Sequence, residues 1–198
     1  NDADITGDST GLFTNLGTLQ KTGGTGTSSF NAIDFTSTST TINISSGSLG
    51  FNSGAIFSGN HTINGPGTLM LSNGTFSFSD GSVFTGALTA NGSAVINLEG
   101  NFTIDTLNIS SGTLNIDSLG LGSTGNTLTI NSALNWSGDT LSGGINGGGT
   151  GILNITSGAV FNITVFKSFA NAIFSFNNVV IDNFGTINYN LSETNDSI

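Results

Sequence analysis

The sequence predicts an all-β fold, a parallel β-helix or β-solenoid, from internal repetition and from short alternating apolar runs. Each repeat combines an alternating strand, a small polar corner with glycine, and a second alternating strand. Four stretches are near-copies of one another: TINISSGSLGF (41–51), TLMLSNGTFSF (68–78), TLNISSGTLNI (106–116) and ILNITSGAVFN (152–162). Repetition every few tens of residues is typical of solenoids, in which each repeat packs on the next.

The alternating runs indicate which side chains face the interior. Apolar residues recur at every second position in short segments bounded by Gly, Asn or Ser, as strands require. We expect inward side chains at Leu69, Leu71, Phe76, Phe78, Leu107, Ile109, Leu114 and Ile116. Asn115 should face outward. No amphipathic helix exceeds two turns, and the segment 165–174 is the best candidate for a short one.

The corners between strands carry glycine at positions 47, 74, 92, 112 and 158. These spacings suggest irregular coils of about 20–25 residues. Glycine accepts the positive φ that a sharp bend between strands needs. The same dipeptides also fit β-hairpins, and short strands with turn signals also fit a β-sandwich, which is the alternative fold.

Polar side chains also recur at matched places within the repeats. Asn43, Asn108 and Asn154 occupy equivalent positions in three of the four units. In stacked coils identical side chains lie above one another, so asparagine and phenylalanine ladders are expected.

Composition restricts the classes of partner. The chain has 198 residues, a net charge of −10, only two lysines, no arginine and no cysteine. A surface with so few cations cannot neutralise a phosphate backbone, so nucleic acid is excluded as a partner, and binding to anionic membranes is disfavoured. No apolar stretch approaches the length of a membrane span. Disulfides are excluded, and no signal peptide is present in this sequence.

The domain organisation expected is a single β-solenoid between two polar tails. Residues 1–11 carry three acids without a strand pattern and form an N-terminal tail or connector. Residues 12–190 form the solenoid, and residues 191–198 form a polar C-terminal tail.

One segment resembles a known type of repeat. Between Phe13 and Phe51 the chain contains Asn15, Gly17, Thr18, Lys21 and the run 23–27, followed by TTINISSGSL. This pattern resembles the repeat of bacterial β-helical surface adhesins of the haemagglutinin or autotransporter type. Ser39 and Thr40 depart from the Asn and Gly of that repeat, while LSGGINGGGTG (141–151) is similar in style. The resemblance implies a secreted, right-handed β-helix without catalytic residues.

Catalytic groups are scarce. Asp105 and Asp117 lie in outward phase and Glu99 precedes them, so a carboxylate pair is conceivable, although solvated outer-face acids are the simpler interpretation. His61 is the single histidine, and without cysteine it cannot complete a zinc site or a catalytic triad. We expect it in a surface turn, and we expect no enzymatic activity.

No cofactor is expected, with calcium as the exception to consider. Asp2, Asp4 and Asp8 stand in the order D-x-D-x-T-G-D, which resembles the start of an oxygen-ligand loop. The twelfth position is Phe13 rather than the bidentate glutamate of an EF-hand. A free acidic terminus is the other interpretation.

Glycosylation sequons are numerous. Candidate acceptors are Asn43, Asn60, Asn73, Asn91, Asn101, Asn108, Asn135, Asn154, Asn162, Asn190 and Asn195.

These patterns predict a structural or adhesive module of an extracellular surface or filament-forming protein. It would assemble end to end with neighbouring copies or repeats of the same protein and could contact surface glycans. A carbohydrate-binding or glycan-active β-helix is one alternative. An ice-binding β-solenoid is another, because Thr36–Thr40 and Thr127/Thr129 are rich in threonine, although the sequence shows no regular array.

Overall fold

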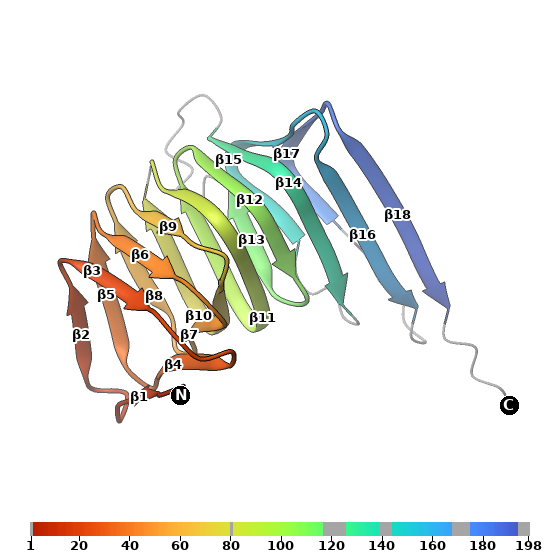
Figure 1. The fold of residues 1–198 in the computed structure, drawn as a ribbon. Coiled ribbons are helices and arrows are strands. Elements are labelled where there is room, and N and C mark those ends of the chain that lie inside the picture. The colour runs from red at the N-terminus through yellow and green to blue at the C-terminus, as the bar shows by residue number, and fades with distance from the viewer. Residues whose placement is uncertain (1, 80, 117–125, 139–143, 168–174, 194–198) are drawn as a thin grey trace, which may run out of the picture.

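The computed structural model confirms the predicted fold class: the described residues form a β-solenoid without helices. It describes residues 2–79, 81–116, 126–138, 144–167 and 175–193. The strands stack as successive rungs, with the first described strands at one end of the stack and the last described strand at the other (Figure 1). Every strand pairing in these ranges is parallel, which rules out the hairpins and the β-sandwich considered above.

Short strands predominate near the N-terminus, whereas several later strands bend across corners. The strands in chain order are β1 (Ile5–Thr6), β2 (Leu12–Asn15), β3 (Thr18–Lys21), β4 (Thr27–Asn31), β5 (Asp34–Thr38), β6 (Thr41–Ile44), β7 (Ser48–Phe51), β8 (Ala55–Ser58), β9 (Thr62–Asn64), β10 (Thr68–Ser79), β11 (Val83–Glu99), β12 (Phe102–Ile109), β13 (Thr113–Ile116), β14 (Thr127–Gly138), β15 (Gly144–Ile155), β16 (Val160–Lys167), β17 (Ser175–Asn183) and β18 (Thr186–Glu193).

The registers sort these strands into three faces, which we name A, B and C. Face A contains β1, β4, β7, β16, β18 and the segments 68–72, 87–91, 106–109 and 133–138. Face B contains β2, β5, β8, β13 and the segments 74–79, 94–99, 144–147 and 175–177. Face C contains β3, β6, β9 and the segments 83–84, 102–104, 127–130, 151–155 and 179–183.

The core consists of columns of apolar side chains that run along the stack. Leu49, Leu69, Leu88, Leu107, Leu134 and Phe161 follow one another in register on face A. All eight residues predicted to face inward are buried, and Asn115 lies between buried neighbours on the outer side, as predicted. Phenylalanine ladders also form, since Phe30 stacks on Phe51 and Phe57 stacks on Phe78 with ring centroids 5.0 and 4.5 Å apart.

The sequence repeats are not the structural coils. Units 41–51 and 152–162 run from face C to face A, whereas units 68–78 and 106–116 run from face A to face B. Asn43 and Asn154 therefore lie on face C and Asn108 on face A, so the predicted ladder through these three residues is wrong. All three faces need the same alternation and the same corner chemistry, so strands of different faces resemble one another in sequence.

Coil length changes along the chain. Leu69 and Leu88 are partners 19 residues apart, whereas Leu107 and Leu134 are partners 27 residues apart. The helix considered at 165–174 is not present over 165–167, because these residues belong to β16; the remainder lies outside the described residues. In the part of the chain that the structure describes, no helix is long and apolar enough to span a membrane.

Candidate functional site

A buried lysine anchors the N-terminal segment to the first coil. Lys21 pairs in register with the core residue Ile44 and is only 6% exposed, so its ammonium occupies an interior position. Its Nζ lies 2.7 Å from Asp2 Oδ1 and donates hydrogen bonds to the Gly23 carbonyl and the Ser28 hydroxyl. The Lys21 hydrogen bond, with help from the Gly26 amide, lowers the pKa of the Asp2 carboxyl.

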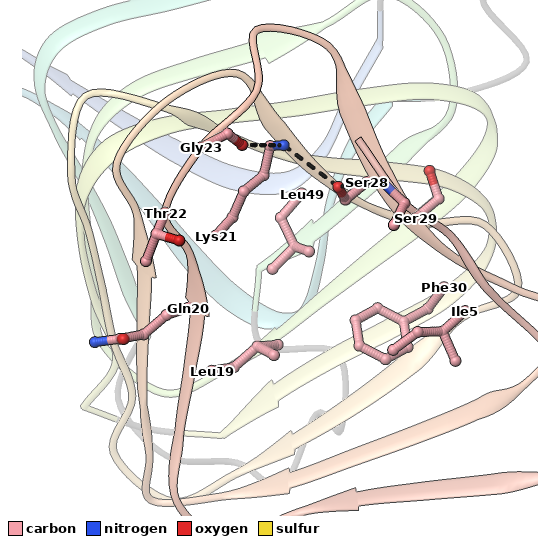
Figure 2. Close-up of a pocket in the computed structure, with 11 residues that line it drawn as sticks. Ile5, Leu19, Gln20, Lys21, Thr22, Gly23, Ser28, Ser29, Phe30 and Leu49 are labelled. Carbon is pink, nitrogen blue, oxygen red and sulfur yellow. Dashed lines mark hydrogen bonds between the residues drawn. The ribbon is translucent and has the colours of Figure 1, made fainter. Parts of the chain in front are cut away.

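A pocket of about 400 Å³ lies beside this ion pair. Leu19, Phe30, Leu49 and Ile5 supply apolar walls, and Lys21 reaches toward Gly23 and Ser28 at one side (Figure 2). A volume of this size suits a small ligand. Asp2 already accepts a hydrogen bond from the lysine at this end of the pocket, so a bound anion would have to displace it.

Removing the Asp2 carboxylate should lower the thermal stability of the protein, because Lys21 is buried. The Asp2→Asn variant leaves a buried ammonium without its counter-ion, so we expect its thermal midpoint to fall below that of the parent. Lys21→Met replaces the ammonium with an apolar group next to Ile44, so we expect a smaller loss or none. The double variant should match Lys21→Met. Strictly additive losses in the double variant would show that the two side chains are not coupled.

The three acids proposed as calcium ligands have separate partners. Asp2 binds Lys21, Asp4 Oδ1 accepts the Ser29 amide at 2.8 Å, and Asp8 Oδ1 accepts hydrogen bonds from Thr10. The Thr10 hydroxyl lowers the pKa of Asp8. The described residues contain no group of three acidic or histidine side chains placed to hold a metal ion. The calcium site stays a prediction.

The segment expected as a polar N-terminal tail or connector, residues 1–11, contacts the first coil. β1 pairs with β4, and backbone amides of Gly7 and Ser9 donate to Asn31 and Ala32. Residues 194–198, most of the expected C-terminal tail, lie outside the described residues.

His61 is buried, not in a surface turn as the sequence suggested. It is 1% exposed, packs perpendicular to the Phe57 ring with centroids 5.5 Å apart, and lies in an interior corner with the buried Ser37, Thr40 and Ser82. Its Nδ1 lies 2.9 Å from the Gly59 carbonyl, and its Nε2 makes no hydrogen bond of good geometry within the described part of the chain. The interior of the corner between faces B and C is polar. It can therefore accommodate the imidazole of His61, for which the sequence predicts a surface turn.

This corner should make stability pH-dependent. Burial lowers the pKa of His61, and the carbonyls of Gly59 and Ser37 partly oppose that shift. The unfolded chain therefore takes up a proton first, as the pH falls through about 6.5. Stability should be complete above this pH and decrease below it by at most about 1.4 kcal/mol per pH unit. Urea unfolding between pH 7.5 and 5 should show this decline in the parent and not in His61→Gln. Equal pH profiles would exclude His61 as its source.

The outer acids considered for catalysis do not form a pair. Glu99 ends the face B segment of β11, whereas Asp105 lies at the corner between faces C and A and accepts a hydrogen bond from Asn131. Asp117 lies outside the described residues.

Asparagine ladders do form on the outer surface, in registers that the repeats did not indicate. On face A the Nδ2 of Asn188 donates to Asn162, Asn162 to Asn135, and Asn135 to Asn108, at 2.7–2.9 Å. On face B, Asn115 donates to Asn97 at 2.7 Å. Each amide donates toward the preceding coil, so the ladders fix the register of neighbouring coils.

Some of the predicted glycosylation acceptors belong to the asparagine ladders. A glycan would attach to Nδ2, and Asn108, Asn135 and Asn162 use that atom within the stack. Among the other predicted acceptors, Asn60, Asn73, Asn101 and Asn190 are exposed, and Asn43, Asn91 and Asn154 are half-buried. Asn195 lies outside the described residues. Glycosylation itself stays a prediction.

Apolar side chains are exposed at both ends of the stack. At the C-terminal end Ile187 and Tyr189 continue the columns of Phe161 and Ile163 and are 41% and 57% exposed. At the N-terminal end Ile5, the register partner of the buried Phe30, continues its column and is 43% exposed. Both ends therefore carry core positions that no described coil covers.

Comparison with known proteins gives no relative for this chain: no protein-family model, curated protein or solved structure matches it.

Proposed function

We propose that the chain is a structural or adhesive module of an extracellular surface or filament-forming protein, and that it assembles end to end with neighbouring copies or repeats of itself. The observation that carries this proposal is the pair of uncovered stack ends. Core-column side chains are exposed there, and the outermost strands of all three faces have one unpaired edge among the described residues.

The parallel registers support the same role. Because all strands run in parallel, the C-terminal edge of one copy presents the backbone groups that the N-terminal edge of another can pair with. Such a head-to-tail contact does not close on itself and leads to filaments. Protection of exposed edges usually relies on lysine, proline or bulges, and the chain has two lysines and one proline.

The resemblance to β-helical adhesin repeats agrees with this role and with an extracellular location. The scattered outer acids and the burial of the single histidine agree with a function without catalysis.

The test is concentration-dependent association measured by sedimentation. The parent should associate, and Tyr189→Lys should weaken association because it places a charge at the uncovered C-terminal end. Ile56→Lys is the matched control, since Ile56 is 53% exposed on face B in the middle of the stack. A parent that remains monomeric at high concentration would contradict end-to-end assembly, as would equal effects of the two lysine variants.

A glycan-binding role is the second candidate, and a groove of about 500 Å³ on face B favours it. Asp34, Thr36, Thr75 and Ser77 line it with oxygen atoms, and Ile56 adds an apolar surface. Binding of soluble glycans that is lost in Asp34→Ala and retained in Asp4→Ala would support this role.

A further inference from the structure

The outer surface of face C carries a regular array of side chains. Its members do not occupy matching positions in the sequence repeats. Successive strands place one β-branched residue in register along the stack, and five of the six are threonine. The column consists of Thr18, Thr41, Thr62, Val83, Thr103 and Thr129. The threonine-rich stretch 36–40 lies mainly on face B and contributes nothing to this column.

A second outward column lies two residues further along each strand. Gln20, Asn43 and Asn64 are in register; in the next three coils Thr85, Asp105 and Asn131 follow the first column by two residues but lie at the corner toward face A, where the register shifts. The first column and the three register-paired amides beside it form a grid of about 4.8 Å across the strands and about 6.6 Å along them, which Thr85, Asp105 and Asn131 extend less regularly.

The residues between the columns hold the grid in place. Ile42, Ile63, Phe84, Ile104 and Ile130 point into the core and are buried, and Leu19 packs against it. Because successive side chains on a strand alternate, the two flanking residues must point outward. Gln20 points away from the inward Leu19 in Figure 2.

The threonine hydroxyls of face C are available to a ligand. Within the described part of the chain, the side chains of Thr18, Thr41, Thr62, Thr103 and Thr129 make no hydrogen bond. Face A differs, because its amides donate to one another along the ladder. The threonine hydroxyls of face C are therefore open to a ligand, whereas Asn131 and Asp105 in the second column are hydrogen-bonded to each other.

The chemistry of the grid restricts its partner. Asp105 is its single charged residue, and no aromatic side chain belongs to either column. The partner must be flat, periodic and uncharged, and must offer both donors and acceptors. Threonine is stiff at χ1, so each methyl and hydroxyl is held in a fixed direction before contact. A sugar polymer would gain little here, because the grid has no ring on which a pyranose can stack.

We propose that face C binds the surface of an ice crystal, through the threonine column and the amide column beside it. Lattice water donates and accepts at each hydroxyl and amide, and the threonine methyl groups fill the space between these contacts. The rigid parallel stack preorganises the grid, so little side-chain entropy is lost on binding. This function concerns one lateral face and is independent of contacts at the stack ends.

The experiment uses solutions of the full chain. It measures the temperature gap between the melting point of ice and the lower temperature at which an ice crystal begins to grow. Thr62→Tyr should remove most of this gap, because a bulky ring stands above the grid. Thr75→Tyr is the matched control on face B, where Thr75 is also exposed, and should keep it. Val83→Thr completes the threonine column with a nearly isosteric residue and should widen the gap. Thermal unfolding of all variants confirms that they are folded.

The proposal is overturned if the parent shows no gap and does not adsorb to ice. It is also overturned if Thr62→Tyr and Thr75→Tyr behave alike while both are folded. Adsorption to crystalline cellulose or chitin that is lost in Thr62→Tyr, without any effect on ice, would assign face C to a polysaccharide instead.

Discussion

Replacing Ile109 with aspartate is expected to unfold the protein. Ile109 is 1% exposed and lies between Ala90 and Trp136 in a face A column. An unpaired carboxylate in this position has no counter-ion, and its desolvation costs several kcal/mol, comparable with a typical stability of about 5–15 kcal/mol. Circular dichroism should show loss of the β spectrum at temperatures where the parent is folded.

Thr113→Asp is the control for this variant. Thr113 precedes the buried Leu114 on face B and points outward, so the same carboxylate stays in water and should cost no more than about 1 kcal/mol. An Ile109→Asp protein that melts like the parent would show that the assigned inward face is wrong.

The second large effect is expected at Gly112. Its φ is +109°, and a Cβ there would collide with the carbonyl oxygen of Ala94 on the neighbouring coil. Gly158 also follows a serine, at the corner between faces C and A, with φ +87°, but a Cβ there meets no atom within 4 Å. Gly158→Ala should therefore cost only backbone strain of about 1–2 kcal/mol.

Gly112→Ala should lose clearly more stability, since the two coils must also move apart. Urea unfolding of both variants gives the comparison. Equal losses would mean that the corner glycines serve backbone conformation alone and that the close approach of neighbouring coils contributes nothing.

The sequence was sufficient to predict the solenoid and its inward side chains. Alternation at Leu69/Leu71 or Leu114/Ile116 reports burial strand by strand, and it does not depend on which strands are neighbours. The assignment of each strand to one of the three faces could not be predicted in this way. Strand 106–109 resembles strand 41–44, yet they belong to faces A and C, because each face has the same requirement for alternation.

The candidate sites could not be located without knowing which strands share a face. The array on face C becomes visible only when Thr41, Thr62, Val83 and Thr103 are aligned by register, because the spacing between coils varies. The burial of His61 was missed for a different reason. A polar residue after Gly-Asn predicts a turn, whereas here the corner between faces B and C has a polar interior formed by Ser37, Thr40 and Ser82.

Cysteine cross-linking tests the stacking of coils most directly, because the chain has no native cysteine. Asn97 and Asn115 are register partners on face B, so the pair Asn97→Cys and Asn115→Cys should form a disulfide rapidly under mild oxidation. Asn43→Cys and Asn108→Cys match in the sequence repeats but lie on different faces, so this pair should stay reduced. A disulfide in the second pair and none in the first would contradict the proposed stack.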